Sequence, residues 1–231
     1  MVIIMTIDEL NIPTIEEQKI IIISDTHLGS IYENIDYLKQ VYEYAKKHNI
    51  KIILHTGDLI QSVARNVSNK YRNEYKQIIH VIEDYPHDED IMNYLSLGNH
   101  DYHTLRKDSE YLETLKTRKD FNILGFKRNY VLWQGNVIGL IHETPKYKIE
   151  IPKLKTLYDF HGHSHKFTNH KGHRILVPPL SDDLKFDSLP GFLVVTLNGT
   201  ITTLEHIEFT PQISEPKLIL IKETTFHKGN F

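Results

Sequence analysis

The sequence predicts an α/β protein in which two β-sheets pack together and helices cover their outer sides. Two observations lead to this fold class. In residues 1–120, strand-like and helix-like segments alternate, which implies a parallel sheet with right-handed crossovers. In the residues that follow, short strand-like segments succeed one another with turn signals between them, which is typical of β-rich pairing.

The first half of the chain contains three strand-like segments. The four β-branched residues of Ile20–Ile23 predict a strand that is buried on both faces, and Lys51–His55 and Met92–Leu97 are similar. Apolar residues at helical spacing predict a helix after each of these strands. They are Ile35, Leu38, Val41, Tyr42 and Ala45 in the first helix, Tyr71, Tyr75, Ile78, Ile79 and Ile82 in the second, and Leu105, Leu112 and Leu115 in the third.

The pattern of the second half of the chain predicts two β-hairpins and two further short strands. The hairpin turns are Gln134-Gly135-Asn136 and Asn198-Gly199, both of which lie between apolar runs. The first hairpin is expected to pair Tyr130–Trp133 with Val137–Ile141, and the second Gly191–Leu197 with Thr200–Phe209. The two further strands are Leu157–His161 and His173–Val177.

No internal repeat, low-complexity tract or linker divides the chain, so we expect one domain over residues 1–231. Its core is expected over residues 19–209, with an N-terminal extension over 1–18 and a peripheral C-terminal tail over 211–231. The N-terminus resembles no targeting signal, and no apolar run approaches the roughly 18 residues of a membrane span. We therefore expect a soluble, cytoplasmic protein without a membrane span.

Composition excludes several classes of site and suggests another. The chain has no cysteine, which excludes disulfide scaffolds, thiolate nucleophiles and Cys-ligated metals. Its net charge of −3 gives no overall attraction to nucleic acid. It has 15 histidines in 231 residues, and imidazole is the commonest metal ligand in proteins.

Histidine and carboxylate residues gather where the expected strands end. The junctions are Ser24-Asp25-Thr26-His27, Gly57-Asp58, Gly98-Asn99-His100-Asp101, Ile141-His142 and Gly162-His163-Ser164-His165. Ligands of open α/β sheets bind beyond the carboxyl ends of strands, so these five loops are expected to converge on one site. Gly-His-x-His is the most specific of these motifs, because a chain of this composition contains it by chance only about 0.05 times.

The ordered set of Asp-x-His, Gly-Asp, Gly-Asn-His-Asp, a lone His and Gly-His-x-His resembles the calcineurin-like metallophosphoesterase family. The motifs extend from Asp25 to His165. The resemblance implies a four-layer αββα sandwich of two mixed β-sheets flanked by helices, with a two-metal site at the strand ends.

The resemblance also implies the ligands of two divalent metal ions. One ion would be held by Asp25, His27, Asp58 and His165, and the other by Asp58, Asn99, His142 and His163. Mixed imidazole and oxygen ligands favour first-row transition metals over Mg²⁺ or Ca²⁺. We expect manganese, with iron, zinc or nickel as alternatives.

The implied activity is hydrolysis of phosphate mono- or diesters by a two-metal mechanism, with a bridging hydroxide as nucleophile. His100 resembles the catalytic histidine of the family, which stabilises phosphoryl charge and protonates the leaving oxygen. Asp101, or another carboxylate nearby, is expected to orient the ring of His100.

Two alternatives accompany this interpretation. Ser24–Gly29 also resembles the opening motif of Mre11/SbcD-type DNA exonucleases, although only some 20 residues follow Phe209 and the net charge is negative. Nucleic acid is therefore a less favoured partner than a small phosphate ester. The alternative from another class is a non-catalytic interaction scaffold on the same fold, like the related retromer subunit, but here every expected ligand is retained. No motif indicates an oligomeric state.

Overall fold

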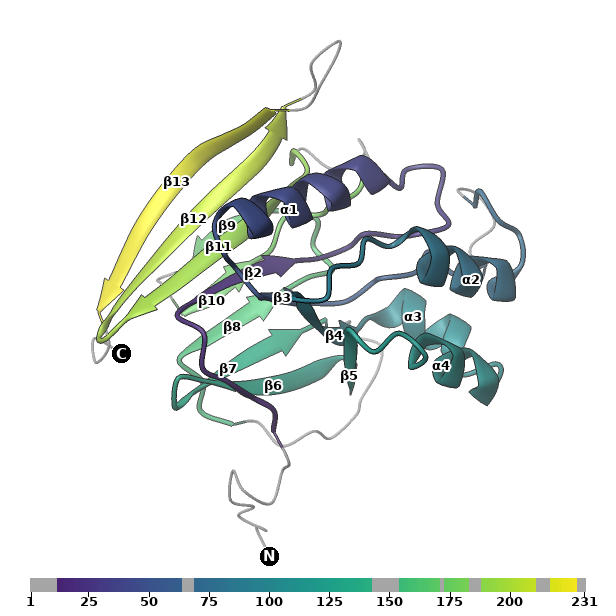
Figure 1. Cartoon of the computed structure of the whole chain (residues 1–231), viewed down its shortest axis with the longest axis horizontal. Helices are drawn as coiled ribbons and strands as arrows, with labels where there is room; N and C mark the ends of the chain where they lie inside the picture. The colour runs from purple at the N-terminus through teal and green to yellow at the C-terminus, as the bar shows by residue number, and fades with distance from the viewer. Residues whose placement is uncertain are drawn as a thin grey trace, which may run out of the picture.

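Two mixed β-sheets lie at the centre of the fold, and the described helices cover the outer face of the seven-stranded sheet (Figure 1). The structure, a computed structural model, describes residues 12–63, 69–142, 154–170, 173–182, 188–210 and 217–227. Within these residues there are four helices and two sheets, of six and seven strands. The predicted α/β fold with two mixed sheets and flanking helices is confirmed.

The seven-stranded sheet has a parallel and an antiparallel half. Its order is β13-β12-β11-β2-β3-β4-β5, and β2 to β5 are parallel to one another. The parallel strands are β2 (Lys19–Ile23), β3 (Ile52–His55), β4 (Met92–Leu97) and β5 (Phe121–Phe126). The antiparallel strands are β11 (Gly191–Asn198), β12 (Ile201–Thr210) and β13 (Lys217–His227).

The helices belong to the crossovers between the parallel strands. They are α1 (Ile35–Lys47), α2 (Glu74–Asp84), α3 (Asn99–Leu105) and α4 (Ser109–Leu115). The leucine spacing predicts a single third helix through Leu105 and Leu115, but the structure has two short helices there. The break occurs because the side chain of Asp108 accepts a hydrogen bond from the backbone N–H of Glu110 and begins a new helix.

The six-stranded sheet contains the first predicted hairpin. Its order is β1-β6-β7-β8-β10-β9. The strands are β1 (Thr14–Ile15), β6 (Arg128–Trp133), β7 (Asn136–Ile141), β8 (Tyr158–His161), β9 (Thr168–His170) and β10 (Arg174–Leu176). Gln134 and Gly135 join β6 to antiparallel β7 with φ angles of 45° and 73°, the positive values that a two-residue type I′ turn requires. The second predicted hairpin, β11 with β12, is also present.

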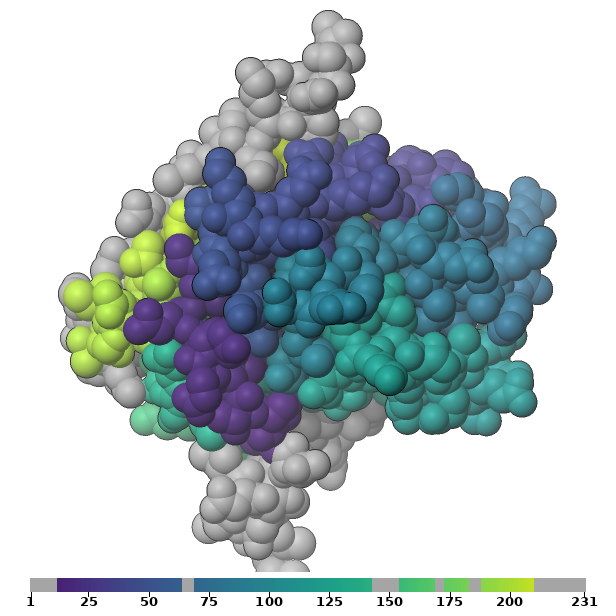
Figure 2. Space-filling view, viewed as in Figure 1, coloured from purple at the N-terminus to yellow at the C-terminus, as the bar shows by residue number. Residues whose placement is uncertain are grey.

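The isoleucine run of β2 connects the two hydrophobic cores. Ile20 and Ile22 pack in the cluster between the two sheets, which also includes Trp133 of β6. Ile21 and Ile23 pack on the other face, in the cluster beneath the helices. Because successive side chains of a strand point to opposite faces, a strand between two cores must be apolar throughout. In Figure 2, residues from the first half of the chain form most of the face shown.

Parts of the expected extension and tail join the sheets. β1, from the expected N-terminal extension, pairs with β6, and β13, from the expected tail, is the edge strand beside β12. Residues 1–11 of the extension and residues 211–216 and 228–231 of the tail lie outside the described residues. No helix in the described part of the chain is long and apolar enough to span a membrane.

Candidate metal centre

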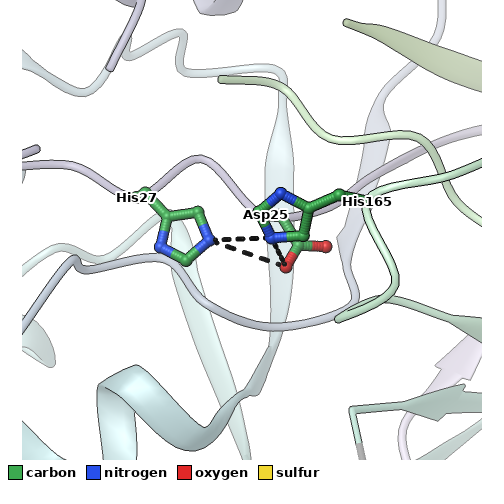
Figure 3. Close-up of side chains that lie close together, drawn as sticks. All are labelled: Asp25, His27 and His165. Atoms are coloured by element: carbon green, nitrogen blue, oxygen red, sulfur yellow. Dashed lines mark hydrogen bonds and ion pairs between the residues drawn. The ribbon is translucent and has the colours of Figure 1, made fainter. Parts of the chain in front are cut away.

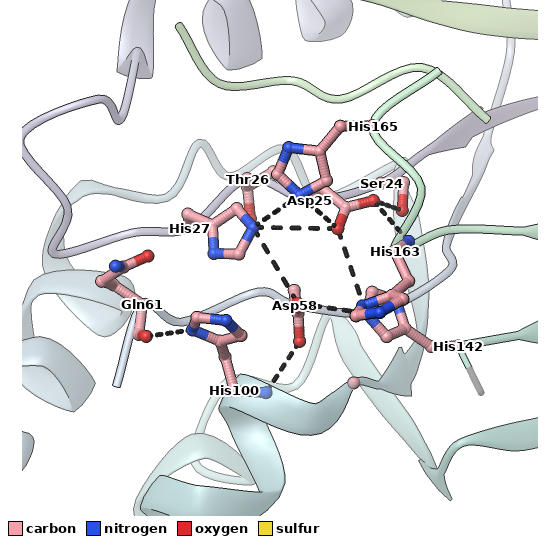
Figure 4. Close-up of polar contacts among 12 residues, drawn as sticks. Ser24, Asp25, Thr26, His27, Asp58, Gln61, His100, His142, His163 and His165 are labelled. Carbon is pink, nitrogen blue, oxygen red and sulfur yellow. Dashed lines mark hydrogen bonds and ion pairs between the residues drawn. The ribbon is translucent and has the colours of Figure 1, made fainter. Parts of the chain in front are cut away.

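The predicted ligands all follow the carboxyl ends of strands, and both sheets contribute. From the seven-stranded sheet, β2 leads to Asp25 and His27, β3 to Asp58, and β4 to Asn99; from the six-stranded sheet, β7 leads to His142, and β8 to His163 and His165. Apart from His163, these side chains belong to buried residues, each at most 8% exposed. The site therefore lies where the strand ends of the two sheets meet (Figure 4).

Asp25, His27 and His165 form one group whose ligand atoms converge (Figure 3). The Nε2 atom of His165 lies 3.2 Å from both Oδ1 of Asp25 and Nε2 of His27. Nε2 of His27 lies 3.7 Å from the same carboxylate oxygen. Two imidazole nitrogens and one carboxylate oxygen thus face a common point, which is an arrangement that suits a cation.

Asp58, His142 and His163 form a second group. Nε2 of His142 lies 3.0 Å from Oδ2 of Asp58, and the rings of His142 and His163 have centroids 5.2 Å apart. The same Oδ2 lies 3.9 Å from Nε2 of His27, so Asp58 stands between the two groups. Ligand atoms of His27, Asp58 and His100 also lie within 4.8 Å of one another.

The backbone is strained at most of these ligands. Asp25, His27, Asp58, His163 and His165 have φ angles between 45° and 70°, in the left-handed region that residues with a Cβ seldom adopt. Each such residue costs roughly 1–2 kcal/mol. Strain of this kind clusters at functional sites, where the surrounding structure holds the backbone in place.

Glycine lets two ligands approach the neighbouring loop. Gly57 has a φ of 120°, and a Cβ added there would collide with the ring of His142. A Cβ added at Gly98 would collide with the carboxylate of Asp58 and would lie 2.5 Å from its backbone nitrogen. The glycines of the Gly-Asp and Gly-Asn-His motifs are therefore needed because ligands pack directly against their α-carbons.

Neighbouring polar groups orient the ligand atoms. Nδ1 of His142 donates a hydrogen bond to the carbonyl oxygen of Thr56 (3.0 Å), so Nε2 is the nitrogen that faces the site. Oδ2 of Asp25 accepts hydrogen bonds from the Ser24 hydroxyl (2.5 Å) and the backbone N–H of His163 (3.0 Å). The other oxygen of Asp25, Oδ1, is left to face the histidines.

His100 lies beside the two groups at the N-terminus of α3. Its backbone N–H donates to Oδ1 of Asp58 (2.9 Å), and its ring packs edge-on against His27 with centroids 4.8 Å apart. Nδ1 of the ring contacts the carbonyl oxygen of Gln61. Because a carbonyl can only accept, Nδ1 carries a proton and Nε2 is the other nitrogen available for chemistry.

The carboxylate of Asp101, which was expected to orient His100, contacts backbone groups in the structure, and the His100 ring contacts Gln61. Both carboxylate oxygens of Asp101 accept from backbone N–H groups, those of Gly98 (2.7 Å), Ile60 (2.8 Å) and Leu59 (3.1 Å). Asp101 thereby ties the loop after β3 to the start of α3. The partner of the His100 ring is a backbone carbonyl, which has no signature in the sequence.

The charges at the site shift the pKa values of its carboxylates downward. Burial would raise the pKa of Asp25, but His165 and His142 hold it well below its usual range. The same competition, with His142 and His100 as partners, lowers the pKa of Asp58. Both carboxylates are therefore ionised at neutral pH and can act as metal ligands.

The pKa values of His27 and His142 shift in opposite directions. Burial lowers the pKa of His27 to about 3. Burial alone would also lower the pKa of His142, but the Asp58 and Asp25 carboxylates raise it to about 9. A cation bound at Nε2 would have to displace that proton, so metal binding at His142 competes with protonation.

Buried ligand atoms support a metal at this place. Among the described residues, Oδ1 of Asn99 is buried without a hydrogen-bond partner, and the ion pairs of Oδ1 of Asp25 and Nε2 of His142 are with other proposed ligands. Buried polar atoms are normally paired, so donor atoms that converge on one another in this way require an explanation. Carboxylate, amide and imidazole donors together fit first-row divalent ions.

Sequence reasoning missed several residues that support the site. They are Ser24, Thr56 and Gln61, two of which act through backbone carbonyls.

His55, which the sequence places in a buried strand, is fully buried in the structure. Its Nδ1 accepts a hydrogen bond from the Gly57 N–H (3.1 Å), and its Nε2 lies 3.1 Å from the Thr26 hydroxyl. Burial lowers the pKa of His55 to about 4, so this histidine is neutral at physiological pH.

Comparison with family models agrees with this fold and site. Residues 19–198, more than half of the chain, match the model of the calcineurin-like phosphoesterase superfamily domain. The chain therefore belongs to the calcineurin-like phosphoesterase superfamily. No curated protein sequence matches the chain.

Solved structures of low sequence identity share the fold. They include Vps29 from Chaetomium thermophilum (14% identity, 91% of this chain and 97% of that chain, TM-score 0.53). Vacuolar Protein Sorting 29 from Cryptosporidium parvum is similar (16% identity, 91% and 98% coverage, TM-score 0.54). So is Yfce, a phosphoesterase from E. coli (17% identity, 89% and 98% coverage, TM-score 0.51).

Proposed function

We propose that this protein is a metal-dependent hydrolase of phosphate mono- or diesters that uses two divalent transition-metal ions. The observation that carries the proposal is the pair of His/Asp groups on either side of Asp58, one with Asp25 and the other with His142. A carboxylate between two cations holds them about 3.5–4 Å apart, the separation used in two-metal phosphoryl chemistry.

The proposed ligand sets follow from these groups. Asp25, His27, Asp58 and His165 would hold one ion, and Asp58, Asn99, His142 and His163 the other. When bound, two such ions would supply a water molecule ionised near neutral pH as nucleophile and would neutralise the charge of the phosphoryl group. Manganese is the proposed native metal.

His100 is the proposed acid of the reaction. The Gln61 carbonyl fixes Nδ1 as a donor, so Nε2 is the nitrogen that can face the ester. In its protonated form the ring would first stabilise the charge of the phosphoryl group and would then donate the Nε2 proton to the leaving oxygen. Asp101 is proposed to act only by positioning the loops that carry Asp58 and Asn99.

The test combines metal analysis with hydrolysis of bis-p-nitrophenyl phosphate. We expect close to two transition-metal ions per chain, loss of activity with a strong chelator, and recovery on addition of Mn²⁺. A panel of mononucleotides, cyclic nucleotides and single-stranded DNA then defines the ester that is preferred. Absence of bound metal together with no activity in Mn²⁺ would refute the proposal.

The same experiment separates the two alternatives. Metal-dependent DNA cleavage, with binding that weakens steeply as salt rises, would favour the exonuclease. A folded protein that binds metal but hydrolyses none of the esters would favour the interaction scaffold.

A further inference from the structure

Gln77 is a polar side chain buried on the face of α2 that packs against the site loops. It is fully buried, and its neighbours on that face include the apolar Ile78 and Val81. Burying an amide is costly unless its hydrogen bonds are made, so a glutamine at such a position calls for a specific role.

The two ends of the Gln77 amide contact different loops. Oε1 accepts a hydrogen bond from the backbone N–H of Ser62 (2.9 Å). Nε2 donates to the carbonyl oxygen of Tyr71 (2.9 Å) and lies 3.5 Å from the Asn69 side chain. The side chain also packs against Gly29, where an added Cβ would lie 2.6 Å from its Cγ.

The bond to Ser62 leads directly to His100. The N–H of Ser62 and the carbonyl of Gln61 belong to one planar peptide unit. Gln77 holds this unit at its N–H, and Nδ1 of His100 contacts it at its carbonyl oxygen. Ser62 has a φ of 65°, so the peptide is held in a strained conformation that it would tend to leave if released.

We propose that Gln77 is a positioning residue for catalysis, which orients His100 through the peptide unit between Gln61 and Ser62. The acceptor Oε1 keeps the Gln61 carbonyl aimed at Nδ1, and that contact keeps Nε2 facing the ester. The inference rests on the proposed function, since it assigns to Gln77 an effect on the acid step.

The substitution Gln77→Met removes the acceptor while keeping the length of the side chain. We expect kcat/KM for an alkyl phosphodiester to fall about 10-fold or more, in the range for residues that orient catalytic groups, and that for a p-nitrophenyl ester to fall less. Gln77→Glu keeps an acceptor for Ser62 and loses the donor that faces Tyr71 and Asn69, so its leaving-group preference should stay close to that of the wild type. Equal losses in the two variants would contradict the role of Oε1.

A double-mutant cycle with His100→Ala decides between positioning and general structural support. If Gln77 acts through His100, Gln77→Met should cost no further activity once His100 is alanine. A cost of the same size in both backgrounds would overturn the proposal. Val81→Ala is the matched control, because it removes buried volume from the same helix and should lower Tm without changing the preference for leaving groups.

A measurement independent of activity completes the test. In the full chain with Zn²⁺ added, the ¹⁵N resonance of His100 Nδ1 should report a protonated nitrogen in the wild type and a mixture of tautomers in Gln77→Met. An unchanged resonance would overturn the proposal even if the protein proves inactive on every ester, whereas inactivity of the wild type alone counts against the proposed function. If Gln77→Met does not fold, Gln77→Asn, whose shorter amide cannot reach Ser62, takes its place with the same expectations.

Discussion

Substitution of Asp101 tests whether this carboxylate holds the site loops together. Asp101→Ala leaves three buried backbone N–H groups without their acceptor, those of Leu59, Ile60 and Gly98. Each buried group left unpaired costs about 1–3 kcal/mol, which sums to roughly 3–9 kcal/mol. Because burial and the nearby charge of Asp58 raise the pKa of Asp101 to about 6, removing the carboxylate also relieves a repulsion. We therefore expect a loss near the lower end, about 3–4 kcal/mol.

Asp101→Asn should cost less, for a reason visible in the geometry. Oδ2 accepts from both Gly98 and Leu59, whereas Oδ1 accepts only from Ile60. A carboxamide oxygen in the place of Oδ2 retains two of the three bonds, so the expected loss is about 1–2 kcal/mol.

The assay is urea unfolding in the presence of a chelator, so that metal binding does not contribute to the measured free energy. Metal content and kcat/KM are measured separately on the folded proteins. Asp159→Ala is the control, because this half-buried carboxylate accepts one side-chain hydrogen bond, from Thr156 (2.7 Å), and lies outside the proposed ligand sets. Its loss should stay near 1 kcal/mol.

Two results would refute this reasoning. A change in unfolding free energy of less than about 1 kcal/mol for Asp101→Ala would mean that the three bonds contribute little. Unchanged stability with a lower rate, and no further effect in a His100→Ala background, would instead restore Asp101 as the partner of the His100 ring.

Three further predictions concern the ligands, the acid and a peripheral ion cluster. Asp58→Ala should lose both metal ions whereas His27→Ala should retain one, as measured by elemental analysis; equal metal content and activity would contradict the shared role of Asp58. His100→Ala should keep its metals and lose about 10²–10⁴-fold in kcat/KM on alkyl esters but much less on p-nitrophenyl esters, and loss of metal would make His100 a ligand. Burial alone would lower the pKa of His80, but hydrogen bonds to Glu33 (2.8 Å) and Asp84 (2.6 Å) raise it. This stabilisation is complete below the unfolded pKa near 6.5 and disappears as pH rises through the higher folded value, so His80→Gln should cost more unfolding free energy at pH 6 than at pH 9.

The sequence predicts the elements whose residues carry a strong pattern of their own. β2 is recognisable because both of its faces are buried, which requires the unbroken run Ile20–Ile23. The β6–β7 hairpin is recognisable from its turn. β5 has no such pattern, since only Phe121 of its six residues is buried, and its pairing depends on β4 beside it.

The candidate ligands could be selected from the sequence because metal coordination needs particular side chains at strand ends. The groups that position the ligands and His100 could not be selected from the sequence. They act through the backbone, or they contact residues far away in the sequence. The Gln61 carbonyl could be any residue's carbonyl, and Asp101 reaches N–H groups about 40 residues away, at Leu59 and Ile60. Gln77 could not be selected either, because the apolar spacing predicts a buried face through Tyr75 and Ile82, whereas the structure buries Gln77, Ile78 and Val81 and leaves Tyr75 exposed.

The strain at the ligands implies that the rest of the site is built to hold them. Five ligand residues with left-handed φ would relax if their loops were free, and together they store roughly 5–10 kcal/mol. Groups that are not ligands oppose this relaxation: the Gly57 carbonyl accepts from the backbone N–H of Asp25, and Asp101 holds the loop that follows Asp58. Positioning groups of this kind should therefore affect metal affinity and catalysis as strongly as some ligands do, even though none of them contacts the substrate.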